Sequence, residues 1–150
     1  MTLLSKHRDA AELDGRLRGA HAVTAALMSD VIGETWRRPT AKTARIERLI
    51  GSGAWLDAAL ALIDLELPQW QVRRIVYDGG EWHCALSRQR ELPDWLDQSV
   101  EVHHQDLALA LLSAFVEARR SATPRSRTSV PPVRRNADLQ GIPVCCDNFA

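Results

Sequence analysis

The chain has 150 residues, of which 45% are hydrophobic and 25% are charged, and its formal net charge at pH 7 is zero. This length and composition fit one globular domain whose core needs no disulfide or metal to stabilise it. The residues after Ala118 carry six Arg against two Asp, which leaves the rest of the chain acidic. An acidic body excludes long-range attraction of the main domain to nucleic acid or anionic lipid.

The sequence favours a cytoplasmic protein that does not enter a membrane. Its start contains no apolar run long enough for a secretory signal, and the acidic residues there are not typical of an organellar transit peptide. The least polar run, Leu107 to Val116, has about half the length that crosses a bilayer. Three Cys, two of them adjacent, form no recognisable disulfide framework, which favours a reducing compartment.

Residues 1–39 are predicted to form an amphipathic N-terminal helical segment. From about Ser5 to Val31, apolar or small residues recur at alternating steps of four and three, which is the spacing of one helix stripe. Gly33 is a suitable end for this helix. The stripe can pack on the core of the same chain or on a second chain, and its spacing does not choose between them. It comprises Leu13, Leu17, Ala20, Thr24, Leu27 and Val31.

Residues 40–120 are predicted to form a compact α+β domain that opens with a helical hairpin. Thr43 can cap a first helix that ends at Gly51, and a second helix can run from the following Ser-Gly pair to about Leu65. Pro68 then forces the chain out of the helical conformation.

A β-hairpin is predicted next, because two runs of alternating character flank the sequence Asp-Gly-Gly. A two-residue turn at the Gly-Gly pair fixes the register, whereas a three-residue loop would turn one strand over. The two-residue turn pairs Tyr77 with Trp82 and Ile75 with Cys84. One face of the hairpin then points toward the core with Ile75, Tyr77, Trp82, Cys84 and Leu86. The other face carries Val72, Arg74, Val76, His83, Ala85 and Ser87.

After the hairpin we expect a loop with one helical turn begun by Asp94, and then a last helix from about Val102 to Arg119. This helix is apolar nearly all round, so it should be the most buried element. Residues 121–150 hold four of the seven Pro and show no periodicity. They are expected to form a flexible, disordered tail rich in Pro and Arg.

No strong catalytic or metal-binding motif is present. His83 and Cys84 are adjacent, and neighbouring residues of a strand point to opposite faces, so this pair neither chelates a metal nor joins a nucleophile to its base. Adjacent helix residues such as His103 and His104 also diverge. We interpret Cys84 as a small buried hydrophobic residue and expect no catalytic residue, metal or cofactor.

The leading functional hypothesis is a non-catalytic protein-interaction or regulatory module that forms a homodimer. A two-stranded ribbon leaves unpaired edges, and such an edge can pair with another chain. The alternative is a small-molecule-binding protein or enzyme with a pocket near the hairpin and the last helix. The candidates to line that pocket or an interface are Arg74, Trp82, His83 and His103.

Weak nucleic-acid binding through the basic tail is the third hypothesis. Four Arg fall within nine residues there, and they are Arg119, Arg120, Arg125 and Arg127. The order of two helices and a hairpin is also that of a winged helix. However, the second helix of that unit offers only acidic charges, so the sequence does not favour nucleic acid as a partner.

Overall fold

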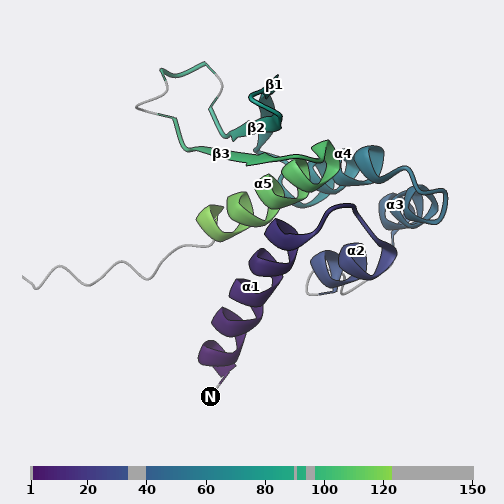
Figure 1. Ribbon diagram of the computed structural model, residues 1–150. Helices are drawn as coiled ribbons and strands as arrows, with labels where there is room; N and C mark the ends of the chain where they lie inside the picture. Colours follow the sequence, from purple (N-terminus) through teal and green to yellow (C-terminus); the bar gives the residue numbers. More distant parts are fainter. Residues whose placement is uncertain (1, 34–39, 90, 94–96, 123–150) are drawn as a thin grey trace, which may run out of the picture.

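Figure 1 shows a computed structural model of the protein, which describes residues 2–33, 40–89, 91–93 and 97–122. Within these residues, helices combine with one three-stranded antiparallel sheet, which confirms the predicted α+β class. The elements are α1 (Thr2–Gly19), α2 (Ala25–Ile32), α3 (Ala41–Gly51), α4 (Trp55–Glu66), β1 (Gln71–Asp78), β2 (Glu81–Ser87), β3 (Ser99–His104) and α5 (Leu107–Ala122). Most of the predicted tail, residues 123–150, lies outside the described residues.

The N-terminal segment forms two helices where the sequence predicted one. Thr24, which we had counted in the helix stripe, has extended backbone angles and acts as the N-cap of α2. Its Oγ1 accepts a hydrogen bond from the N–H of Leu27 at 3.2 Å. This bond satisfies a backbone donor that a helix start leaves unpaired, so Thr24 favours a new helix over continuation of α1. Gly33 ends α2, as predicted.

The helical hairpin is confirmed, but its first cap is Thr40 and not Thr43. Oγ1 of Thr40 accepts from the N–H of Thr43 at 3.3 Å, and Oγ1 of Thr43 accepts from the N–H of Thr40 at 2.7 Å. The two residues therefore form a capping box at the start of α3. Gly53 has a φ of +73°, a left-handed conformation that favours glycine, and it leads into α4.

The hairpin of β1 and β2 has the predicted two-residue turn, in which Gly79 and Gly80 have φ of +59° and +91°. The predicted pairs of Tyr77 with Trp82 and of Ile75 with Cys84 are both present. One face assignment is wrong, because a β-bulge between Val72 and Arg74 inserts Arg73 as an extra residue. Val72 therefore lies opposite Leu86 and packs against the core, and not on the outward face.

The segment after the hairpin contains a third strand that the sequence analysis missed. β3 pairs antiparallel with β2, so residues expected to begin the last helix belong to the sheet. α5 begins only at Leu107. Asp106 precedes it, and Oδ1 of Asp106 accepts a hydrogen bond from the N–H of Leu109 at 2.9 Å. The helical turn predicted at Asp94 lies outside the described residues.

α5 is the central element of the fold. It packs against β2 and β3 on one side and against α4 and α1 on others, and Figure 1 shows it between the sheet and α1. Every residue from Ala108 to Val116 is buried, as expected for the most buried helix. Leu17 of α1 and Met28 of α2 are completely buried in the same hydrophobic cluster, so the N-terminal helices pack on the core of their own chain. Among the described helices, none is long and apolar enough to cross a membrane.

Candidate functional site

The four candidate residues from the sequence do not gather at one place. Arg74, His83 and His103 lie on the sheet face that points away from α5, where the rings of His83 and His103 are 5.7 Å apart between centroids. Trp82 lies on the opposite face, with its ring centroid 5.1 Å from that of Tyr77. The alternation of strand residues thus separates Trp82 from the other three. A surface hollow lies elsewhere, on α3, and is lined by Arg45, Arg48, Leu49 and Ser52.

Two cross-strand polar pairs lie on the outward face. Nη2 of Arg74 lies 2.6 Å from Oε1 of Glu101, and Nδ1 of His103 lies 2.9 Å from Oε2 of Glu81. These side chains are between 40% and 64% exposed. Pairs with this much exposure contribute at most about 1 kcal/mol. The first therefore ties β1 to β3 across β2 only loosely, and the second ties β3 to β2 only loosely. Their charged groups remain accessible to a partner.

Asp97 has an important structural role that the sequence did not indicate. Its side chain is fully buried and accepts hydrogen bonds from the Ser87 hydroxyl, from the Gln89 N–H at 3.0 Å and from Arg73 Nη1 at 2.7 Å. The Ser87 hydrogen bond is the largest cause that lowers the pKa of Asp97, followed by the bond from Gln89 and the contact with Arg73. The carboxylate therefore links Ser87, at the end of β2, to Arg73, in the bulge of β1.

Cys84 is a core residue. Its side chain is completely buried, and burial raises the pKa of the thiol to about 11. A thiol with this pKa is almost entirely neutral at pH 7, whereas a nucleophilic cysteine reacts as the thiolate. The described residues also contain no group of three or more His, Cys, Asp or Glu side chains that could hold a metal ion.

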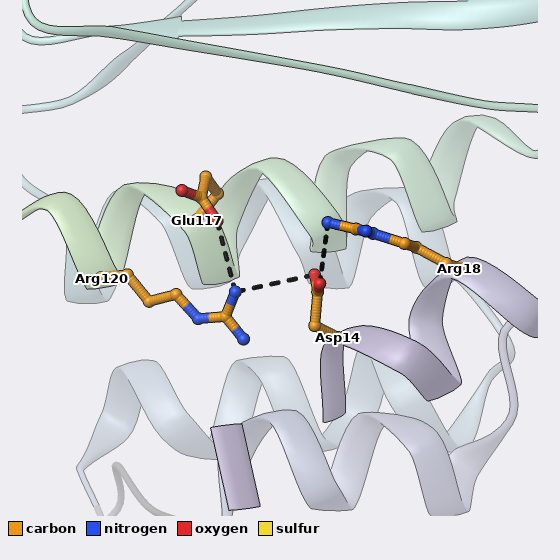
Figure 2. A network of polar contacts seen from close by, with 4 residues as sticks. All are labelled: Asp14, Arg18, Glu117 and Arg120. Atoms are coloured by element: carbon orange, nitrogen blue, oxygen red, sulfur yellow. Dashed lines mark hydrogen bonds and ion pairs between the residues drawn. The ribbon is translucent and has the colours of Figure 1, made fainter. Parts of the chain in front are cut away.

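Two of the four predicted basic residues hold the helices together. Nη1 of Arg120 lies 3.4 Å from Oε2 of Glu117 and 3.8 Å from Oδ1 of Asp14 (Figure 2). Asp14 also pairs with Arg18 at 2.8 Å. The guanidinium of Arg119 stacks on the ring of Phe115, with 5.5 Å to its centroid, and Arg119 Nη1 donates to the carbonyl of Val31 at 3.4 Å. Both arginines therefore link α5 to the N-terminal helices. Arg125 and Arg127 lie outside the described residues.

An edge of the sheet presents the most unusual surface of the described residues. We call residues Arg74 to Asp78 the β1 edge. Three consecutive apolar side chains are exposed there, Ile75 by 38%, Val76 by 42% and Tyr77 by 58%. The predicted side of Ile75 and Tyr77 is right but their expected burial is not, because α5 packs against β2 and β3 and leaves the end of β1 uncovered.

Comparison of the chain with protein-family models, with curated proteins and with solved structures found no match. The geometry of the described residues therefore has to support the functional conclusion. The feature that most resembles a binding surface is the β1 edge, because an edge strand whose side chains stay exposed and apolar on both of its faces is open to pairing with another chain.

Proposed function

We propose that the protein is a cytoplasmic, non-catalytic protein-interaction or regulatory module that binds an extended strand of a protein partner along the β1 edge. The observation that carries this proposal is the run of exposed Ile75, Val76 and Tyr77 on a strand with a neighbour on one side only. An edge strand offers unpaired backbone groups to another chain, and the side chains around it select the partner.

The backbone of the β1 edge has groups free to bind such a strand. In an antiparallel hairpin with a two-residue turn, the residues that flank the turn form a hydrogen-bonded pair, here Asp78 and Glu81, and the pairs then alternate along the strands. The N–H and C=O of Ile75 and Tyr77 therefore point away from β2. Within the described residues these outward groups meet no further strand. They are available to pair with a partner.

The opposite edge of the sheet is less suited to this role. β3 has six residues, compared with eight in β1, and its most exposed side chains include the polar Glu101 and His103. Short length and charged side chains are the usual means by which proteins protect a sheet edge from pairing. β1 is longer and exposes Ile75, Val76 and Tyr77 in succession, so it is the edge better suited to a partner.

Two observations weigh against the other hypotheses. A small-molecule site made from the four candidates would need them around one pocket, but Trp82 lies on the other face of the sheet from His83 and His103. Nucleic-acid binding by the basic segment would use Arg119 and Arg120, which are engaged within the domain. Neither alternative has a described feature comparable to the β1 edge.

The proposal can be tested with proline, which removes one backbone N–H at a time. Ile75→Pro removes a donor that points away from β2, a position where edge strands tolerate proline. Ile75→Thr is the matched control, because it shortens the apolar side chain but keeps the N–H. We expect extended peptides selected for binding to the wild-type protein to bind Ile75→Thr with a modest loss and Ile75→Pro hardly at all.

Amide hydrogen exchange locates the binding surface independently. In the complex with a selected peptide, the amides of Ile75 and Tyr77 should become protected, while the amide of Val76, which bonds to β2, should change little. Peptides that bind Ile75→Pro as tightly as the wild type, or that protect amides outside β1, would show that the β1 edge is not the binding element.

A further inference from the structure

We infer that the strand bound at the β1 edge is β1 of a second copy of this chain, in an antiparallel register centred on Val76. The inference rests on the proposed function and names its partner. It joins the two three-stranded sheets of a symmetric homodimer into one continuous sheet. Three features of the edge select this arrangement: the positions of its outward backbone groups, its charges and its exposed apolar side chains.

The backbone selects the register. A two-fold axis pairs the residue that lies a given number of positions before the central residue with the one that lies the same number after it in the other copy. The backbone N–H and C=O groups that point away from β2 in one copy must also meet such groups in the other. Centring on Val76 pairs Ile75 of each copy with Tyr77 of the other, so both residues exchange their N–H and C=O across the axis. Centring on Ile75 instead would bring Tyr77 opposite Arg73, the extra residue of the bulge, where regular pairing is disrupted.

The charges of β1 are complementary in the same register. With Val76 on the axis, Arg74 of each copy lies opposite Asp78 of the other, and opposite charges on facing strands attract each other. Asp78 makes no ion pair with a described residue in the single chain. Arg74 pairs with Glu101 across its own sheet, where both side chains are about half exposed, so its guanidinium can turn to Asp78 at little cost.

The exposed apolar side chains are also matched. Val76 of one copy faces Val76 of the other on the outward side, while Ile75 faces Tyr77 on the side of α5. The three side chains that a single chain leaves exposed thus cover one another across the axis. The same patch therefore serves both copies, as an interface with two-fold symmetry requires.

The dimer should be weak and reversible. Only the residues from Arg74 to Asp78 of each copy pair across the axis. The surface that they bury is smaller than the surface buried in a stable, obligate dimer. The hydrophobic core is complete within one chain, since Cys84 and Leu86 of the sheet are buried by that chain alone. We therefore expect a monomer–dimer equilibrium that depends on concentration, and not a chain that folds only as a dimer.

A charge exchange between two variants tests the register. In Arg74→Glu, acidic residues face one another at both charged pairs of the homodimer, and in Asp78→Lys basic residues do so. Each variant alone should dimerise about tenfold more weakly than the wild type. An equimolar mixture of the two should form a heterodimer of about wild-type affinity, because every charged pair is then of opposite sign. Sedimentation velocity with one variant fluorescently labelled measures both equilibria.

Control measurements keep the test separate from folding and from the proposed function. Thermal unfolding of both variants should stay close to that of the wild type, because both positions are exposed and the exposed Arg74–Glu101 pair contributes at most about 1 kcal/mol. A mixture that associates no better than its components would overturn the register, and a wild-type protein that stays monomeric up to about 1 mM would overturn the homodimer. In either case, peptide binding that is lost in Ile75→Pro would leave the proposed function standing. A dimer that is unaffected by Ile75→Pro would overturn pairing through β1, and only peptide binding that is likewise unaffected would contradict the proposed function.

Discussion

Substitution of Leu17 tests whether α1 packs on the core of its own chain. Its side chain in α1 is completely buried in the cluster that includes α5. Leu17→Ala removes three buried carbon atoms, which is a loss of about 2.4 kcal/mol at about 0.8 kcal/mol for each. The cavity left behind adds to this loss, so we expect a total of about 3 to 4 kcal/mol in the free energy of unfolding. For a chain of this length the melting temperature should fall by roughly 6 to 15 °C.

Leu56→Ala is the matched control for this experiment. It makes the same chemical change in α4 at a side chain that is 38% exposed, so the expected loss is below about 1 kcal/mol. Urea unfolding followed by tryptophan fluorescence and circular dichroism measures both variants. If Leu17→Ala were no more destabilising than Leu56→Ala, α1 would not be docked on the core of its own chain, and pairing of α1 with a second chain would have to be reconsidered.

Three further predictions concern single residues. Hydrogen bonds lower the pKa of Asp97 from its ordinary 3.8, so its contribution to stability is present above that value and is lost as the pH falls through the lower folded pKa. The urea midpoint of the wild type should therefore fall more steeply below about pH 4 than that of Asp97→Asn. Cys84, with a pKa of about 11, should not react with a thiol reagent at pH 7 until denaturant is added, and rapid labelling of the native protein would contradict its burial. Thr40→Ala should lower the free energy of unfolding by about 1 kcal/mol because the capping box is lost, while Thr40→Ser should keep most of it.

The hairpin was predictable because its determinants are local. Gly79 and Gly80 adopt positive φ angles that favour glycine, and a two-residue turn leaves a single register for the flanking strands. The bulge at Arg73 was not predictable from the hairpin sequence, and the carboxylate that its side chain contacts belongs to Asp97, which lies 24 residues away in the sequence. Nothing in the immediate surroundings of Arg73 indicates that its side chain will meet a buried carboxylate.

The missed strand and the broken helix have a common cause. Val100 and Val102 alternate with Glu101 and His103, which is a strand pattern, but it is too short to outweigh the apolar helix that follows. β2 supplies the hydrogen bonds that make this segment a strand, and that contact is not visible in the local sequence. In the same way, the helix stripe through Thr24 was regular, but regular spacing does not show that the side chain will cap a new helix.

The sequence predicted the sheet face on which the side chains of the β1 edge lie, but not how far those side chains are exposed. Strand alternation correctly placed Ile75 and Tyr77 on the side of Cys84, and His83 on the other. Alternation does not tell how far a covering helix extends along the sheet. Because α5 reaches β2 and β3, Cys84 is completely buried while Tyr77, at the same face, remains 58% exposed. The interaction surface arises from this incomplete cover.

The third strand changes the argument for self-association. A two-stranded ribbon would have two similar edges and would need a partner to be stable, so dimerisation and folding would be the same event. β3 supplies the missing neighbour of β2, and the core closes within one chain. The remaining edges then differ, because β1 exposes the apolar Ile75, Val76 and Tyr77 while the exposed side chains of the shorter β3 are polar. Association through the β1 edge is therefore separable from folding: substitutions at Arg74 or Asp78 should change the dimer equilibrium without changing the unfolding transition, and Leu17→Ala should do the reverse.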